Sequence, residues 1–85
     1  MGSYKLLIKP SAARQIEAVR KADRLRIVRK IQALSDEPRP HGSEKLSAEE
    51  KYRLRQGSYR IVYSISDADK TVVVVKVGHR REVYR

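Results

Sequence analysis

Four cationic side chains, Lys51, Arg53, Arg55 and Arg60, lie within ten residues of this 85-residue chain, and no carboxylate lies among them. Such a group of like charges repels itself unless an anion occupies the space between its members. Arginine is suited to phosphate, because its planar guanidinium group can donate two parallel hydrogen bonds. The stretch therefore predicts a site for a phosphate-bearing ligand.

Lysine, arginine, histidine and tyrosine side chains can together cleave RNA. The substrate carries its own nucleophile, the 2′-hydroxyl, so the protein must remove its proton, neutralise charge on the phosphate and protonate the leaving 5′-oxygen. A lysine among other cations can become a base because its pKa is lowered. His41 and His79 have no metal-ligand spacing, and no phosphate-binding glycine motif or nucleophile elbow is present. We therefore expect no metal and no cofactor.

The cationic stretch is predicted to lie on a β-hairpin. Lys51–Ile65 reads KYRLRQGSYRIVYSI, with a glycine-containing turn at residues 56–58. Because side chains on a strand alternate between two faces, the apolar residues form one face and the cations the other. Tyr52, Tyr59 and Tyr63 are accordingly expected in the core rather than as platforms for stacked bases.

A strand and two helices are predicted before the hairpin. Tyr4–Lys9 reads as a short strand that ends at a proline. A helix over Ser11–Lys21 would begin with Ser11 as its N-cap, and a second helix over Arg24–Leu34 would begin with Asp23 in that role. The short link between the helices predicts an antiparallel helical hairpin lying across a sheet.

The remaining segments complete an α+β domain. Asp36–Glu50 contains two prolines and a glycine and reads as a loop, and residues 67–70 read as a turn. Thr71–Val77, rich in valine and ended by Gly78, predicts a central strand covered on both faces. We expect one domain over residues 1–85: an N-terminal strand, a two-helix hairpin and a three-stranded antiparallel meander. The helices pack on one sheet face, and the other face carries the cations.

Composition limits the function classes. The net charge is +10 and the pI is about 10.3, which favours nucleic acid, an anionic membrane surface or an acidic protein as partner. The alternative is a merely soluble, charged surface, but the cations cluster at residues 51–60 and 76–85. The chain has no cysteine, no apolar run of membrane-spanning length and no signal-peptide pattern. We expect a cytoplasmic protein with no membrane partner.

Three segments resemble the RelE/ParE superfamily of bacterial toxins, and within it the RelE branch of ribosome-dependent mRNA endonucleases. They are KYRLRQGSYRIVYSI, the valine-rich strand and the C-terminal VGHRREVYR. The pattern is [KR]-x-[KR]-L-R-x-G-x-Y-R-[ILV]-x-Y, followed by V-G-[HK]-R and a near-terminal V-Y. The resemblance implies the same order of elements, although the N-terminal half matches only in pattern. It also implies a toxin of a type II toxin–antitoxin system that cleaves mRNA in the ribosomal A site.

The resemblance implies roles for five matching residues. Lys51 and Arg53 match the two basic residues before the glycine turn, implied to serve as base and charge stabiliser. Arg60 matches an arginine implied to hold the scissile phosphate. Arg80 matches one implied to stabilise the transition state or help the leaving group. Tyr84 matches a tyrosine implied to orient or stack on a base.

One departure from the family pattern shifts the base role. An arginine cannot act as a base near neutral pH, so Arg53 leaves that role to Lys51, His79 or Tyr84. His79 stands where some members carry lysine, and its acid or base role is our own inference. Further basic residues expected to contact RNA are Arg55, Arg81 and Arg85.

Other interpretations remain open at this point. The ParE branch shares the fold and implies a non-catalytic inhibitor of DNA gyrase, and a simple nucleic-acid-binding module would show salt-dependent affinity without cleavage. Arg55 could instead be structural, paired with Glu49 or Glu50. The partners expected for a RelE-type toxin are a RelB-like antitoxin, mRNA on the ribosome and ribosomal RNA.

Overall fold

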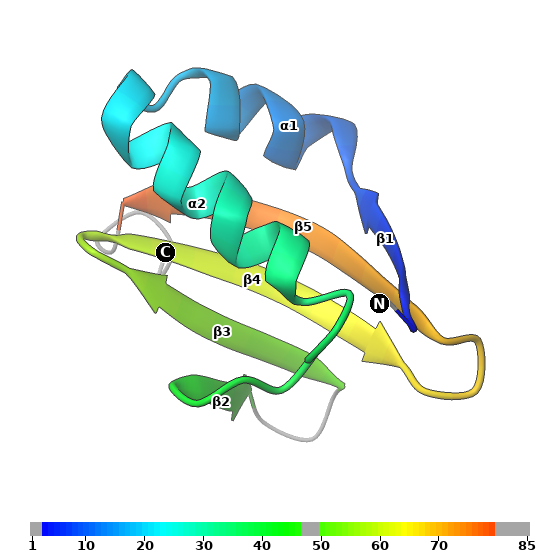
Figure 1. The fold of residues 1–85 in the computed structure, drawn as a ribbon. Coiled ribbons are helices and arrows are strands. Elements are labelled where there is room, and N and C mark those ends of the chain that lie inside the picture. The colour runs from blue at the N-terminus through cyan, green and yellow to red at the C-terminus, as the bar shows by residue number, and fades with distance from the viewer. Residues whose placement is uncertain (1–2, 47–49, 80–85) are drawn as a thin grey trace.

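The computed structural model describes residues 3–46 and 50–79, in which two helices cover one face of a five-stranded sheet (Figure 1). The elements are β1 (Lys5–Ile8), α1 (Pro10–Glu17), α2 (Lys21–Ala33), β2 (Ser43–Leu46), β3 (Lys51–Gln56), β4 (Tyr59–Ser66) and β5 (Thr71–His79). The strands lie in the order β1-β5-β4-β3-β2. The predicted α+β class, with its helix pair and antiparallel meander, is confirmed.

The β3–β4 hairpin has the predicted turn, and its apolar side chains face the helices as predicted, although Arg60 and Val62 on the other face are also buried. Gly57 has a φ of +60°, a left-handed conformation that is strained for other residues, which explains the glycine between the strands. Leu54 pairs with Ile61 and Tyr52 with Tyr63, all facing the helices and all buried. The predicted turn between β4 and β5 is also present.

Strand β5 has the predicted central position, between β1 and β4, but it is longer than predicted and has an irregular register. It does not end at Gly78 but continues to His79, because Gly78 and His79 pair with the start of β4. Its first half pairs in parallel with β1, and its second half extends past the end of β1. An extra residue at Val75 shifts the register with β4, since Tyr63 pairs with Val74 but Val62 pairs with Lys76.

Both predicted helix N-caps are wrong. Helix α1 begins at Pro10, whose fixed φ and missing N–H group suit the first helical position, and Lys9 rather than Ser11 is the cap. Helix α2 begins three residues before Arg24, so Asp23 lies in its first turn instead of preceding it. A carboxylate in that turn still favours the helix, because it faces the positive end of the helix dipole.

The segment predicted as a loop contains a strand. Residues Ser43–Leu46 form β2, which pairs antiparallel with β3 and forms one edge of the sheet. Its sequence SEKL has no apolar alternation, because β2 is held by its main-chain pairing rather than by a buried face. The segment after α2 therefore adds a fifth strand beside the cationic hairpin.

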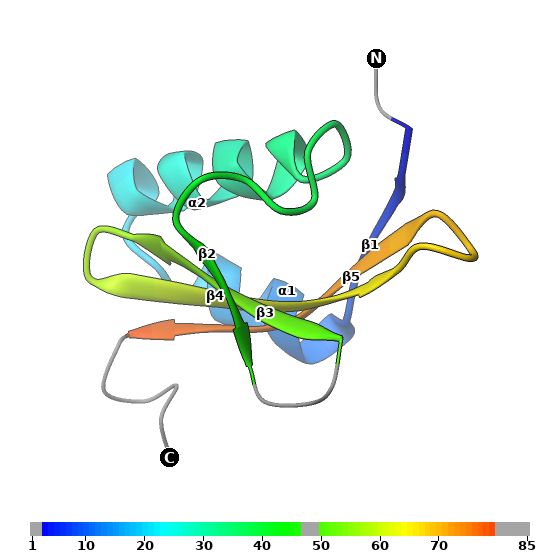
Figure 2. The same cartoon turned by 90° about the horizontal axis from the view of Figure 1, so that it is seen from below.

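A single apolar core lies between the helices and the sheet. The residues of α1 and α2 that enter it include Ala12, Ile16, Ile27 and Ile31, and Tyr63 at the centre is fully buried. Figure 2 views the sheet from its β2 edge and shows its twist, with α2 along one side. Helix α1 contacts β5 and helix α2 contacts β3, so the two helices pack on different halves of the sheet.

Strands β3 and β4 are tied to the loop after α2 by polar contacts. The Tyr63 hydroxyl donates to the Pro38 carbonyl at 2.8 Å, and burial raises the pKa of Tyr63 to about 12. Arg39 donates from both terminal nitrogens to Asp67, at 2.9 and 3.2 Å, and from Nε to the Tyr52 hydroxyl at 2.9 Å. The Arg39 hydrogen bonds hold the pKa of Asp67 at about 2. These contacts fix the loop against the far end of the sheet from the β3–β4 turn.

Candidate RNA-binding face

The cations of the hairpin share the sheet face that the helices leave uncovered. Directly opposite residues in an antiparallel pair project to the same side. Arg55 lies opposite Arg60, and Arg53 lies opposite Val62, which in turn lies opposite Lys76 of β5. Because these residues alternate with the core residues of their strands, they form rows across the outer face. We call this outer surface, made of Lys51, Arg53, Arg55, Arg60 and Lys76, the basic face.

Lys76 is a member of the basic face that sequence reasoning missed. The alternation of the valine run suggested no particular side for it. The extra residue at Val75 moves Lys76 to the face opposite the buried Val74 and Val77. The signal available in the sequence was that Lys76 is the one charge in a run of valines.

Arg53 is engaged by a carboxylate from β2. Its Nη2 donates to Glu44 at 2.7 Å, and the two residues lie opposite each other in the β2–β3 register. The Arg53 side chain is 19% exposed and the Glu44 side chain 60% exposed, so water reaches this ion pair. A phosphate on the basic face would compete with Glu44 for Arg53.

Arg60 and Arg55 occupy one row but differ in exposure. Arg60 is 4% exposed and is the buried charged residue among those described, whereas Arg55 is exposed. The β5 residue opposite Arg60 is Gly78, which has no side chain to occupy the space beside the arginine. Of the two carboxylates predicted as partners of Arg55, Glu50 contacts Lys45 and Arg39 instead, and Glu49 lies outside the described residues.

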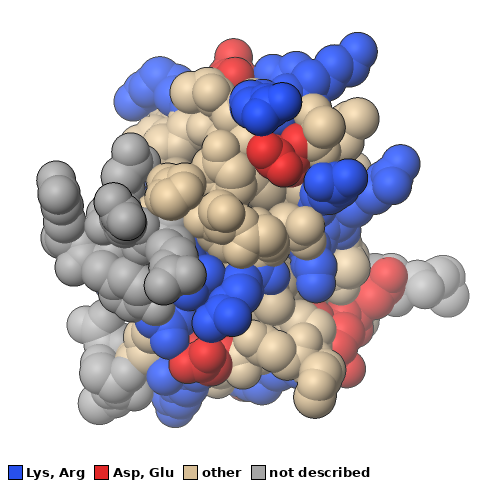
Figure 3. Space-filling view, turned by 90° about the vertical axis from the view of Figure 1, so that its left-hand side faces the viewer, with Lys and Arg blue, Asp and Glu red and all other residues tan. Residues whose placement is uncertain are grey.

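Positive charge dominates the end of the molecule where β5 ends and the β3–β4 turn lies. In the space-filling view of this end, blue lysine and arginine side chains predominate over red carboxylates (Figure 3). Helix α2 adds exposed cations on the other side of the sheet, including Arg26 and Arg29, which flank a shallow depression with Gln56. The charge is therefore concentrated at one end but not confined to the basic face.

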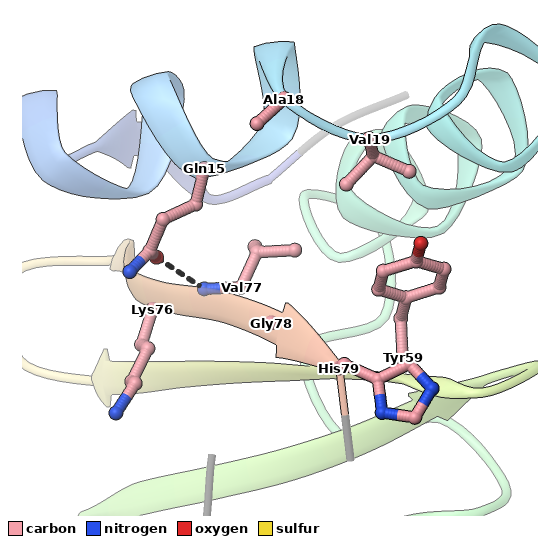
Figure 4. A pocket seen from close by; sticks show the side chains of 8 residues that line it. All are labelled: Gln15, Ala18, Val19, Tyr59, Lys76, Val77, Gly78 and His79. Atoms are coloured by element: carbon pink, nitrogen blue, oxygen red, sulfur yellow. Dashed lines mark hydrogen bonds between the residues drawn. The ribbon is translucent and has the colours of Figure 1, made fainter. Parts of the chain in front are cut away.

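A cleft of about 620 Å³ lies beside the basic face, where helix α1 ends over strand β5. Its walls come from α1 and the segment after it, from the start of β4 and from the end of β5 (Figure 4). The rings of Tyr59 and His79 meet edge-to-face in it, with centroids 5.8 Å apart. Gln15 accepts a hydrogen bond from the Val77 N–H at 2.8 Å. The full lining is Gln15, Ala18, Val19, Tyr59, Lys76, Val77, Gly78 and His79.

The predicted site residues divide into two sets. The structure brings Lys51, Arg53, Arg55 and Arg60 together on one face and places His79 at the end of β5, in the cleft. The four predicted site residues that follow His79 lie outside the described residues: Arg80, Arg81, Tyr84 and Arg85. Of the predicted core tyrosines, Tyr52 and Tyr63 are buried and Tyr59 packs partly exposed against the core.

Residues 3–46 and 50–79 contain neither a metal-binding cluster nor a membrane-spanning helix. Among them no three histidine, aspartate or glutamate side chains come together as a set that could hold a metal ion. Neither helix in this part of the chain has the length and hydrophobicity needed to cross a lipid bilayer.

The fold and the sequence match a known class of toxins. A family model described as "ParE toxin of type II toxin-antitoxin system, parDE" matches residues 6–84. Toxin RelG of Mycobacterium tuberculosis is 44% identical over 34 residues, a match that spans 40% of this chain and 39% of that protein. The class defined by these features is the small toxin of type II toxin–antitoxin systems. The chain belongs to the ParE toxin family of the RelE/ParE superfamily.

Solved structures of RelE toxins have the same fold along nearly the whole chain. The toxin–antitoxin complex RelBE2 of Mycobacterium tuberculosis contains a chain with a TM-score of 0.79 and 28% identity, and the match covers 92% of this chain and 99% of that one. A mutant Escherichia coli toxin RelE in the free state has a TM-score of 0.79 and 27% identity, covering 99% and 92%. The resemblance predicted from three segments is therefore confirmed at the level of family and fold.

Proposed function

We propose that this toxin is a ribosome-dependent endonuclease that cleaves mRNA in the ribosomal A site by attack of the substrate's own 2′-hydroxyl. The observation that carries the proposal is the basic face: four cations of one hairpin and Lys76 lie in adjacent rows on the sheet face that the helices leave uncovered. RelE toxins with this fold support it, since they resemble the chain over almost all of its length.

The basic face supports charge stabilisation and phosphate positioning. Arg60 and Arg53 carry guanidinium groups that can bind the non-bridging oxygens of a phosphate in two parallel hydrogen bonds. Charge grows on these oxygens as the 2′-oxygen attacks, so fixed cations stabilise the transition state more than the ground state. In this proposal Lys51, His79 or Tyr84 removes the proton from the 2′-hydroxyl, and Arg80 assists the leaving group.

The proposed chemistry needs no metal, because the nucleophile is part of the substrate and the cations supply the charge stabilisation. It does need the 2′-oxygen to lie in line with the leaving 5′-oxygen, and few groups on one sheet face can impose that geometry on a flexible strand. We propose that the ribosome holds the codon in this geometry, which makes naked RNA a poor substrate. The reaction would then take place in the cytoplasm, where translating ribosomes are found.

The partners follow from the same proposal. An antitoxin that neutralises this toxin has to cover a face of high positive charge, so we propose an acidic or amphipathic segment of a RelB-like protein. The Mycobacterium tuberculosis relative solved as the toxin–antitoxin complex RelBE2 supports an antitoxin of that kind. Ribosomal RNA is the second proposed partner, because phosphate-rich surfaces surround a bound codon.

Primer extension on an mRNA in a purified translation reaction tests the proposal, with the same mRNA lacking ribosomes as the comparison. We expect discrete cuts within codons that need ribosomes. Arg60→Lys should reduce cleavage about 100-fold or more, because lysine keeps the charge but not the bidentate geometry. Thermal unfolding of the variant provides the folding control, since Arg60 is buried. Cleavage at the wild-type rate by the folded variant would remove Arg60 from the site.

A second function is favoured by one specific observation, the match to a model described as ParE toxin. A non-catalytic gyrase inhibitor with this fold would leave the mRNA intact and would block DNA supercoiling by gyrase at low toxin concentration. Supercoiling inhibition together with intact mRNA would replace the endonuclease proposal. Cleavage without supercoiling inhibition would support it.

A further inference from the structure

We propose that the cleft between α1 and the end of β5 binds an unpaired nucleobase of the RNA whose backbone crosses the basic face. The inference rests on the proposed function for its biological setting. It concerns residues for which the endonuclease chemistry has no use, chiefly Gln15, Ala18 and Tyr59. They would set which nucleotide sequence is cut.

The cleft has the size and lining of a nucleobase site. Its volume of about 620 Å³ lies within the range of small-molecule pockets, about 300–1,000 Å³. Two rings, Tyr59 and His79, stand in it edge-to-face and present surfaces on which a base can stack. None of the described residues that line it is acidic, and Lys76 places a positive charge at its rim. An anionic polymer with planar bases fits these features.

Lys76 connects the cleft to the basic face. It lines the cleft, and its side chain projects to the side of β5 opposite Gln15, as Figure 4 shows. On that side Lys76 lies in the row of Arg53 and Val62. A strand of RNA held by the basic face therefore passes Lys76 beyond the end of β1, and the next base can turn into the cleft.

Gln15 supplies a polar group with a fixed orientation. Beyond β1, none of the strands in the described residues pairs with β5 on this side, and the Gln15 Oε1 atom accepts from the Val77 N–H. Because an N–H group can only donate, the oxygen of the amide must face Val77, and the Nε2 group is left as the donor. This arrangement favours a base that presents an acceptor, such as a purine ring nitrogen or a base carbonyl.

The direct test is NMR of the isotope-labelled toxin with a 2′-O-methyl trinucleotide, which cannot be cleaved because its 2′-oxygens carry no proton. We expect shifts of the Gln15 side-chain NH₂ group, the Val77 amide and the His79 ring, in addition to shifts on the basic face. Ala18→Phe should fill the cleft without removing a hydrogen-bonding group and weaken binding about tenfold, the contribution of one stacked base.

Ala22→Phe is the matched control, because Ala22 is also an exposed alanine but does not line the cleft. Equal binding by Ala18→Phe and Ala22→Phe would overturn the inference, as would shifts confined to the basic face or an absence of any shift at millimolar trinucleotide. A cleft that binds the trinucleotide in a toxin that cuts no mRNA would leave the inference standing and would refute the proposed endonuclease function.

Discussion

The ion pair between Glu44 and Arg53 offers a sensitive test of the basic face. Glu44 is the carboxylate that the β2–β3 register sets opposite Arg53, with the charged atoms 2.7 Å apart. If RNA phosphate and Glu44 compete for this guanidinium, then Glu44→Gln should strengthen RNA binding. The substitution keeps the size and hydrogen-bonding capacity of the side chain and removes its charge.

The magnitude follows from the exposure of the pair. With side chains 19% and 60% exposed, the pair belongs to the solvent-screened class, worth about 0.2–1 kcal/mol. Releasing Arg53 should therefore raise the affinity for single-stranded RNA about 1.4- to 5-fold. If Arg53 gains one phosphate contact, the slope of log K against log salt concentration becomes steeper by about 0.7.

Fluorescence anisotropy with a labelled 2′-O-methyl RNA over a range of salt concentrations measures both quantities. Glu17→Gln is the control, because it makes the same change in net charge from helix α1, on the other side of the sheet. Equal effects of the two substitutions would show that only net charge matters and would refute a phosphate site at Arg53. A weaker affinity for Glu44→Gln would refute the competition itself.

Two further predictions concern the loop that is tied to β3 and β4. Tyr63→Phe should lower the free energy of unfolding by about 1–3 kcal/mol, because the buried Pro38 carbonyl loses its donor, and urea unfolding that gives wild-type stability would contradict the assigned hydrogen bond. Asp67→Asn should destabilise the protein at neutral pH, because Arg39 loses a charged acceptor. The Asp67 pKa is about 2 in the folded protein and about 4 in an unfolded chain, so its stabilisation is complete above about pH 4 and is lost towards pH 2. Urea unfolding at several pH values should show the two proteins converging as the pH falls through this range, and a difference independent of pH would contradict the role of this carboxylate.

The hairpin could be predicted because its information is local. The alternation of residues 51–65 separates the side chains that face the helices from those on the outer face, where Arg60 and Val62 are nevertheless buried. A glycine marks the turn at Gly57. The resemblance to the family predicted the same hairpin and, in addition, the order of the surrounding helices and strands. The alternation and the family resemblance were together sufficient to predict that the cations from Lys51 to Arg60 share one face.

What the sequence did not reveal depends on contacts between distant segments. Strand β2 has no apolar pattern of its own, since β3 provides its partner groups, so Glu44 could not be placed opposite Arg53. Lys76 reaches the basic face only because Val75 is an extra residue in β5. The cleft depends on the hydrogen bond between Gln15 and Val77, which are 62 residues apart. The helix starts were misplaced because serine and aspartate are common caps, whereas Pro10 begins the first helix.

The chemical form of the cleaved ends tests the central claim, that cations on this sheet face promote attack by the 2′-hydroxyl. The products of the ribosome-dependent reaction can be isolated and their ends identified by mass spectrometry, with a 2′-O-methyl group at the cut site as the matched control. The account predicts a 2′,3′-cyclic phosphate on the upstream fragment, a 5′-hydroxyl on the downstream fragment and no cleavage of the 2′-O-methyl mRNA. A 3′-hydroxyl with a 5′-phosphate, or cleavage of the methylated mRNA, would contradict it, because water would then be the nucleophile.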